Sequence, residues 1–205
     1  LESGDKVIND LENYFKEKAN PKVLLRIIEI LAKIGSTRAK SVLLNYIEYP
    51  NRKVQHEIIA ALYFCKYQAE SKELPVIRKK IESVVDNILW IYTCILDTET
   101  ERNTLKLIQA IDLERELNFE VLFKLLSFIY EPRIINLIRK NIIGKNTIFA
   151  LEIVDNFISQ EEKELIIPLF DDISVSQKLK KLNPLFPQKR LSFYNRLNDI
   201  ITQDY

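Results

Sequence analysis

Apolar residues recur every three to four positions along most of the chain, a period that predicts helices almost from end to end. The clearest segment is PKVLLRIIEILAKIG, which begins at Pro21 and ends at Gly35. Pro21 suits the first turn of a helix, and Gly35 suits a C-terminal cap. Its polar side chains form one narrow stripe, at Lys22, Arg26, Glu29 and Lys33. Because the remaining circumference is apolar, we expect other helices to cover this helix on more than one side.

A second helix is expected directly after Ser36, a residue type that caps helix N termini. Pro50 ends this segment, because proline cannot continue a helix. The expected apolar face comprises Val42, Leu43, Tyr46 and Ile47, and the opposite face comprises Ser41, Asn45 and Glu48. Two short helices joined by a tight turn form an antiparallel hairpin.

This helix pattern returns further along the chain. The segment NPKVLLRIIEILAKI aligns with NRKVQHEIIAALYFC, which places Val23 on Val54 and Leu31 on Leu62, an offset of 31 residues (54 − 23). The same offset pairs Ile27 with Ile58 and Ile28 with Ile59, and it leads from Val54 to Val85. In addition, ALEIVDNFIS from Ala150 echoes IIEILAKIGS from Ile27, with Glu152 on Glu29. A short period with two helices per unit is typical of a helical solenoid.

The predicted fold is therefore all-α, an α-solenoid of HEAT-like antiparallel helix pairs in one domain over residues 1–205. An N-terminal helix is expected over residues 5–18. The helix pairs are expected over residues 21–49, 51–80, 82–113, 117–143, 146–172 and 174–203.

Composition agrees with helices joined by short turns. Three glycines in 205 residues argue against hairpins and phosphate-binding loops, which need glycine for positive φ. Thirty basic and 29 acidic residues leave a net charge of +1, so no strong overall field attracts nucleic acid or anionic lipid. No stretch reaches the roughly 18 apolar residues that span a bilayer. Because the sequence starts at Leu1 and contains no Met, we interpret it as a piece of a longer chain.

Few residues suggest chemistry. Cys65 and Cys94 are 29 residues apart (94 − 65), without a CxxC motif and with a single histidine, so we expect two buried, reduced thiols and no zinc site. His56 has no partner nearby in sequence, and we interpret it as a surface or groove-lining residue; a catalytic role is the alternative. We expect no cofactor, no metal and no catalytic residues, because the usual motifs are absent.

Charged clusters have two interpretations. The acidic cluster is Glu161, Glu162, Glu164, Asp171 and Asp172, which we expect to be a solvated face or turn. The basic residues form two groups, Lys178, Lys180, Lys181, Lys189, Arg190 and Arg196, and Arg133, Arg139, Lys140 and Lys145. The basic groups predict either a mixed-charge solvated surface or a site for phosphate or acidic lipid.

Two expectations concern packing. Trp90 lies in the most apolar helix and is expected in the core. The last helix is expected to bury its apolar side and to expose the opposite side. The apolar side contains Leu191, Tyr194, Leu197 and Ile200 or Ile201, and the opposite side contains Ser192, Asn195, Arg196 and Asp199.

At its repeat positions the chain resembles short bacterial HEAT repeats, often called PBS-lyase HEAT-like. The resembling residues are Pro21, Val23, Ile27, Leu31, Gly35, the helix at 39–47, Val54 and Leu62. The usual Arg after the helix-starting Val is Leu24 in the first unit and Gln55 in the next. Residues 146–174, NTIFALEIVDNFISQEEKELIIPLFDDIS, resemble a segment in the HEAT region of bacterial ATP/ADP translocase-like (ADP,ATP carrier) proteins.

The resemblance implies a non-enzymatic scaffold or protein-interaction module, on the cytoplasmic face of a membrane-embedded nucleotide transporter. It implies about a dozen membrane-spanning helices upstream of Leu1. The partner would be another protein or neighbouring domains of the same chain. The alternative is a soluble HEAT-repeat module that binds nucleic acid, and a third hypothesis is a phycobilin-lyase-like enzyme.

Overall fold

The computed structural model describes residues 2–17, 20–99, 101 and 104–202. This part of the chain contains eleven α-helices and no β-strand, which confirms the all-α prediction. Lys18 and Gln203, the predicted ends of the first and last helices, lie outside the described residues. The sequence predicts one continuous array, whereas the helices group into two compact units, residues 1–70 (unit 1) and residues 71–203 (unit 2). Each unit is described by itself.

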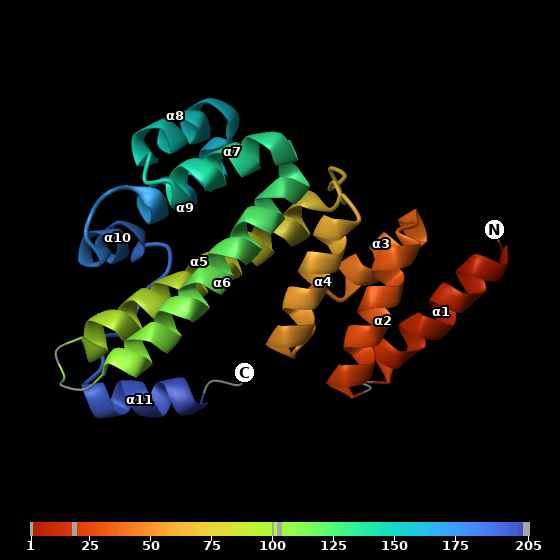
Figure 1. Cartoon of the computed structure of the whole chain (residues 1–205), viewed down its shortest axis with the longest axis horizontal. Helices are drawn as coiled ribbons and strands as arrows, with labels where there is room; N and C mark the ends of the chain where they lie inside the picture. Colours follow the sequence, from red (N-terminus) through yellow and green to blue (C-terminus); the bar gives the residue numbers. More distant parts are fainter. Residues whose placement is uncertain (1, 18–19, 100, 102–103, 203–205) are drawn as a thin grey trace. The chain divides into compact units, whose positions relative to one another are not determined.

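Unit 1 is built around α2, which contacts the other three helices of the unit (Figure 1). Its helices are α1 (Glu2–Lys16), α2 (Pro21–Ile34), α3 (Thr37–Asn45) and α4 (Arg52–Phe64). The predicted boundaries of α2 follow from local chemistry. Asn20 Oδ1 accepts a hydrogen bond from the Lys22 amide at 2.9 Å, and Gly35 ends the helix with φ of 60°. Ser36 then caps α3 by accepting a hydrogen bond from the Ala39 amide at 3.2 Å, and both α2 and α3 lie within the range 21–49 expected for the first pair.

The core of unit 1 follows the predicted register. Leu31 and Leu62, at equivalent positions of the two segments, are both fully buried. The polar stripe of α2 is exposed, and Glu29 binds both Arg26 and Lys33, at 2.9 and 2.8 Å. These two ion pairs explain why the pKa of Glu29 is lowered, with the hydrogen bond from Lys33 as the larger cause.

The apolar circumference of α2 is only partly covered. Val23, Ile30 and Ile34 are each more than two-fifths exposed. They follow one another at spacings of seven and four residues and so lie on one side of the helix. Val23 and Val54 are predicted to be equivalent, but their burial differs: Val23 is exposed, whereas Val54 is fully buried.

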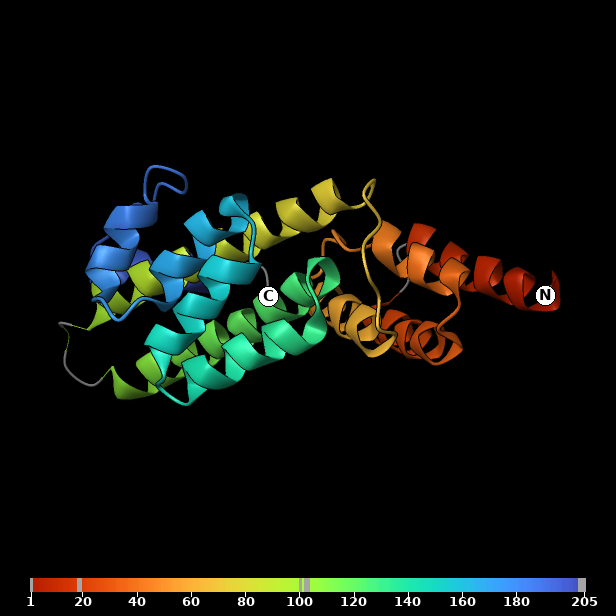
Figure 2. The ribbon, with the colours of Figure 1, turned by 90° about the horizontal axis from the view of Figure 1, so that it is seen from above.

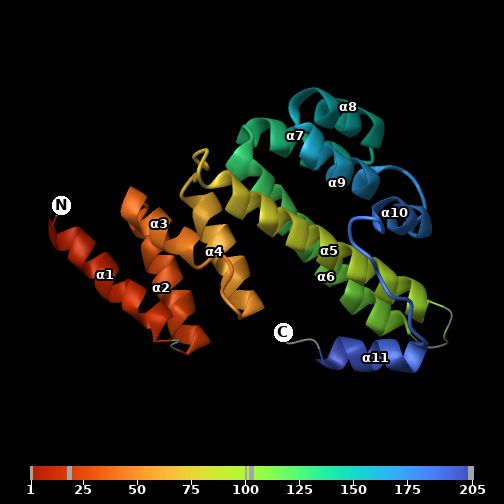
Figure 3. The ribbon, with the colours of Figure 1, turned by 180° about the vertical axis from the view of Figure 1, so that it is seen from behind.

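Unit 2 begins with a long hairpin, α5 (Leu74–Thr98) and α6 (Leu105–Ile129), whose helices lie side by side along most of their length (Figure 1, Figure 3). The predicted helix ends in this region are not those observed. Residues 65–73 are not helical, α5 runs through the expected boundary between residues 80 and 82, and α6 runs through the one between residues 113 and 117. No glycine or proline occurs between Pro75 and Pro132, so neither residue type interrupts the helices at the two expected boundaries.

Five shorter helices complete unit 2: α7 (Pro132–Ile143), α8 (Thr147–Phe157), α9 (Gln160–Phe170), α10 (Val175–Leu182) and α11 (Phe193–Thr202). From α6 to α10 each helix contacts the next one along the chain (Figure 2). The pair predicted over 146–172 matches α8 and α9. Both α10 and α11 also pack on α5, which brings the end of unit 2 back to its beginning.

The interior of unit 2 is partly polar. All buried polar and charged residues in the described part of the chain belong to this unit: Lys80, Thr93, Asp97, Thr98, Thr104, Asn118, Ser127, Glu162 and Arg196. Asn118 on α6 illustrates their role, because it accepts a hydrogen bond from Asn87 on α5 at 2.8 Å. Such contacts between neighbouring helices keep buried polar groups satisfied.

Candidate functional site

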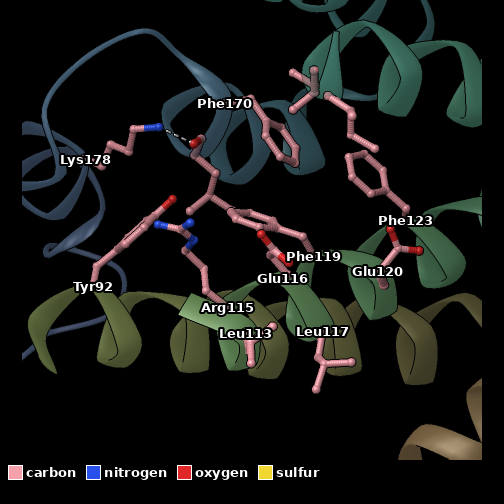
Figure 4. Close-up of a pocket in the computed structure, with 13 residues that line it drawn as sticks. Tyr92, Leu113, Arg115, Glu116, Leu117, Phe119, Glu120, Phe123, Phe170 and Lys178 are labelled. Atoms are coloured by element: carbon pink, nitrogen blue, oxygen red, sulfur yellow. Dashed lines mark hydrogen bonds between the residues drawn. The ribbon is translucent and has the colours of Figure 1, made fainter. Parts of the chain in front are cut away.

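A groove of about 830 Å³ opens between α5, α6, α7, α9 and α10 of unit 2 (Figure 4). We call it the phenylalanine groove, after Phe119, Phe123 and Phe170 in its wall. Its volume lies within the range of roughly 300–1,000 Å³ that is usual for ligand sites. Most of the lining is apolar; among its charged side chains, Lys178 and Arg115 lie toward one end, Glu120 toward the other, and Glu116 between them.

Aromatic stacking fixes the shape of the groove. Phe119 and Phe123 are one turn apart on α6, and both contact Phe170, the last residue of α9. The Phe123 and Phe170 rings stack at a centroid distance of 5.3 Å and an interplanar angle of 12°, and Phe119 lies at 5.3 Å from Phe170 with a tilt of 38°. Offset aromatic pairs of this kind contribute about 0.5–1.5 kcal/mol beyond area burial. The groove wall is therefore rigidly held.

One end of the groove is basic. Lys178 of α10 donates a hydrogen bond from Nζ to the Leu169 carbonyl at 2.6 Å, and its ammonium lies 6.0 Å from the centroid of the Tyr92 ring. Burial lowers the pKa of Lys178, an effect that Asp171 and Asp172 oppose and Arg115 reinforces. Figure 4 shows Lys178, the Tyr92 hydroxyl and the Arg115 guanidinium gathered at this end.

Tyr92 and Arg115 add a phenol and a guanidinium to this end of the groove. Burial raises the pKa of Tyr92 to about 12, so its phenol stays protonated. Arg115 forms an ion pair with Asp112, one turn earlier on α6, at 3.0 Å. An arginine has five N–H donors, so this pair leaves donors that point into the groove region.

The other end carries Glu120, which is neutralised. Arg139 of α7 donates to Glu120 from Nε at 2.9 Å and from a terminal nitrogen at 2.5 Å. Glu116 lies one turn before Glu120 and is exposed. The groove thus has a donor-rich end and an end with a neutralised carboxylate.

The groove lining consists of a few residue types. None of the described residues that line the groove is His, Cys, Ser or Thr. Over the described chain, no group of three or more His, Cys, Asp or Glu side chains is placed to hold a metal ion. What the groove offers is apolar surface with a few charged groups.

The predicted candidate residues lie elsewhere. His56 is half-buried in the first turn of α4, in unit 1. Both cysteines are free thiols: Cys94 is fully buried, while Cys65 is half-buried and donates from Sγ to the Ala32 carbonyl at 3.2 Å. Burial raises the pKa of both, that of Cys94 to about 12. The prediction of two buried thiols is therefore right for Cys94 and only partly right for Cys65.

The acidic cluster is not simply a solvated face. Glu162 is buried at the start of α9 and accepts hydrogen bonds from Tyr130 at 2.7 Å, from Arg78 at 2.8 Å and from the Ser159 hydroxyl. Burial alone would raise the pKa of Glu162, but these hydrogen bonds and the charge of Arg78 outweigh it and hold the pKa below its usual value. Arg78 also binds the exposed Glu161, at 2.8 Å.

The remaining acidic residues fit the prediction better. Glu164 and Asp172 are exposed, and Asp171 is half-buried and binds Lys181 at 3.0 Å. Glu162 is thus the exception, and it joins α9 to α5 and to the end of α6.

Four of the ten residues in the two basic groups form ion pairs with described carboxylates: Arg139, Lys181, Arg190 and Arg196. Arg196 is buried and forms ion pairs with Asp97 at 2.9 Å and with Asp199 at 2.5 Å. Arg190 binds Asp97 at 2.5 Å, and Arg139 binds Glu120. The exposed members without such a pair in the described part of the chain are Arg133, Lys140, Lys145, Lys180 and Lys189. Arg190 and Lys181 are exposed as well, and Lys181 pairs with Asp171 at 3.0 Å. This arrangement agrees with a mixed-charge surface.

The last helix follows the prediction only in part. On the expected apolar side Leu197 and Ile200 are half-buried, and Ile200 packs against the core cluster of Ile91, Cys94 and Ile111. On the opposite side Ser192 and Asn195 are exposed.

Arg196 is the buried residue of α11, whereas Tyr194 and Ile201 are about four-fifths exposed. Asp97 on α5 is buried and pairs with Arg196, which turns this residue of the expected exposed side inward. Trp90 is correspondingly only partly buried; its ring packs against the core cluster and its indole N–H donates to Asp199 at 2.9 Å.

Sequence reasoning missed the groove and the two buried carboxylates. One signal was available for Glu162, because Ser159 and Glu162 have the spacing of a capping box. Phe119 and Phe123 have the one-turn spacing of a shared helix face. Nothing local indicates that Phe170 or Lys178 would join them.

Comparisons with known protein families, with curated proteins and with solved structures find no match to this chain. None of the helices in the described residues is both long enough and apolar enough to cross a membrane.

Proposed function

We propose that this chain is a non-enzymatic binding module built from HEAT-like helix pairs, and that the phenylalanine groove binds an apolar-faced segment of a protein partner. The observation that carries the proposal is the groove, a stacked aromatic wall beside apolar side chains that remain open to solvent. Exposed contiguous apolar surface of this kind marks interaction sites in soluble proteins.

The rim indicates the size of the occupant. Leu113 and Leu117 on α6 are 63% and 52% exposed, and Ile143 at the end of α7 is 65% exposed. All three line the groove and extend its apolar surface outward. A segment with a continuous apolar face, such as an amphipathic helix, covers both the wall and the rim.

Burial at repeat positions supports the HEAT-like solenoid. Ile27 and Ala150 are buried, Leu31 and Val154 are buried, and Glu29 and Glu152 are exposed. The stacking of α7, α8, α9 and α10 in chain order also fits repeated helix pairs. The return of α10 and α11 to α5 is a departure from simple stacking.

The wider context belongs to the same proposal. The resemblance of residues 146–174 favours a region of an ATP/ADP translocase-like nucleotide transporter, facing the cytoplasm. In that setting the partner is another protein or a neighbouring domain of the same chain. The upstream coding sequence tests this context, since the proposal requires about a dozen membrane-spanning helices before Leu1.

The binding function is tested with a displayed library of amphipathic helices. Selection on the native chain should yield binders. Serine at both Leu113 and Leu117 should lower their affinity by about tenfold or more, because two leucines that become buried on binding are removed. Leu105 is the matched control, being 69% exposed on the same helix but outside the groove lining. Absence of any binder, or an equal effect of Leu105→Ser, would contradict the proposal.

A further inference from the structure

The basic end of the phenylalanine groove has more hydrogen-bond donors than the described residues use. Lys178 has three N–H donors, and one of them binds the Leu169 carbonyl. Arg115 binds Asp112 from one terminal nitrogen. The Tyr92 hydroxyl lies beside the Arg115 guanidinium in Figure 4. Three different donor groups therefore converge on one end of an otherwise apolar groove.

A carboxylate is the group that such an end recognises. Ammonium and guanidinium groups bind carboxylates through charge-assisted hydrogen bonds, and these are strongest where water is partly excluded. Lys178 is half-buried and Tyr92 is buried, so water is partly excluded from this end. Asp171 and Asp172 face Lys178 from the end of α9, but Asp171 is already bound to Lys181.

The opposite end gives the occupant a direction. Arg139 neutralises Glu120 there, so that end attracts neither a carboxylate nor a cation strongly, and the exposed Glu116, one turn earlier on α6, disfavours a carboxylate farther along the groove. An acidic group of the occupant is thus favoured at the Lys178 end only.

We propose that the occupant of the phenylalanine groove is an amphipathic helix of a protein partner, with an Asp or Glu at one end that pairs with Lys178 and Arg115. This inference rests on the proposed function and adds the chemistry and direction of the partner. Apolar side chains at helical spacing lie over the three phenylalanines, and the acidic residue follows them toward α10.

A free aliphatic acid has the same carboxylate chemistry, but the rim favours the helix. An aliphatic acid that fits inside the groove leaves Leu113, Leu117 and Ile143 in water. An amphipathic helix has a wider apolar stripe and covers these side chains as well.

The test is selection from a displayed library of amphipathic helices, with fixed apolar positions and randomised polar positions, on the full chain. The native chain should enrich Asp or Glu at one end of the helix. Lys178→Glu should enrich Lys or Arg at the same position. For a selected peptide, Lys178→Gln should weaken binding about tenfold, the loss of one charged hydrogen bond. Lys180→Glu, an exposed change on the same helix, should leave both the preference and the affinity unaltered.

The outcomes separate this inference from the proposed function. Binders without an acidic preference, or with a preference that Lys178→Glu does not reverse, would overturn the inference and leave the binding function standing. Decanoate serves as the free aliphatic acid. If decanoate binds the native chain but not the Lys178→Gln variant, and no peptide is selected, the groove is an aliphatic-acid site and both proposals fail. Circular dichroism checks that each variant keeps its helix content, and Lys178→Gln provides the test if Lys178→Glu does not fold.

Discussion

Unit 1 and unit 2 bury different kinds of side chain. In the described residues, the interior of unit 1 is aliphatic and aromatic, whereas unit 2 also buries nine polar or charged residues. Helices of unit 1 are short and begin at side-chain caps such as Asn20, Ser36 and Asn51. Helices of unit 2 include two of 25 residues, and contacts such as Asp97 to Arg196 join residues 99 positions apart.

The difference shows two ways in which helices are held together. Apolar burial in unit 1 is non-directional and tolerates changes that conserve volume. Buried ion pairs in unit 2 add little net stability compared with apolar residues, yet losing one partner is costly because the other charge stays buried. Unit 2 is therefore expected to be more specific about which helix faces which, and more sensitive to single polar substitutions.

The largest effect is expected at Asp97. Alanine at this position removes the carboxylate that binds Arg190, Arg196 and the Leu191 amide. The free energy of unfolding should fall by about 3–5 kcal/mol, the range for breaking a buried pair. Urea unfolding measures the loss, and hydrogen exchange should show faster exchange in α11. Glu82→Ala, at an exposed position of the same helix, should have almost no effect. Equal losses of stability in the two variants would mean that the Asp97 carboxylate does not hold α11 against α5.

In unit 1 the largest effects should come from apolar truncation. Leu31→Ala and Leu62→Ala should each lower the free energy of unfolding by about 2–5 kcal/mol, the range for fully buried leucines. Glu29→Ala, on the exposed stripe, should leave the free energy of unfolding almost unchanged. If urea unfolding showed a larger loss of stability for Glu29→Ala than for Leu31→Ala, the register of unit 1 would be wrong.

A smaller, pH-dependent effect is expected at Glu162. Because its folded pKa is lowered, its contribution is present above the unfolded value, near 4.5, and is lost as pH falls through the folded pKa. Glu162→Gln should cost about 1.5–3 kcal/mol near neutral pH, as charged hydrogen bonds do. The difference from the native chain should shrink below about pH 4.5 in acid unfolding. Glu164→Gln, exposed on the same helix, is the control, and a constant difference across this pH range would contradict the assignment.

The smallest effects should be stabilising and should occur in both units. Lys66 follows α4 and Lys145 follows α7, with φ of 51° and 59°. Glycine accepts this left-handed conformation without steric cost, so Lys66→Gly and Lys145→Gly should each raise stability by up to about 1 kcal/mol. Lys140→Gly, within α7, should instead lower stability by about 1 kcal/mol in thermal unfolding. If Lys140→Gly and Lys145→Gly changed the stability in the same direction, the backbone explanation would be ruled out.

The two units also differ in how far their sequences predict them. In unit 1, Pro21, Gly35 and Ser36 mark helix ends, and the 31-residue offset places Leu31 and Leu62 correctly in the core. In unit 2, residues 76–131 contain no proline or glycine, and the same period predicts helix boundaries there that are not observed. Apolar periodicity describes one helix at a time and gives no information about which distant side chains meet.

The candidate site depends on such distant encounters. Phe119 and Phe123 could be assigned to one face of α6, but Phe170 and Lys178 reach the groove only because α9 and α10 return toward α5 and α6. The side chains of α11 show the same limit. Its apolar stripe predicted burial of Tyr194, yet Tyr194 is exposed and Arg196 is buried against a carboxylate 99 residues before it.

Trp90 gives unit 2 an intrinsic optical reporter. It is the single tryptophan of the chain, its indole N–H binds Asp199 of α11, and the Arg196 guanidinium lies 6.0 Å from its ring. Any event that lifts α11 from α5 exposes this indole to water and removes a nearby charge, so its fluorescence emission should move to longer wavelength. The docking of the last helix can thus be followed in real time, in the unmodified chain and without any label.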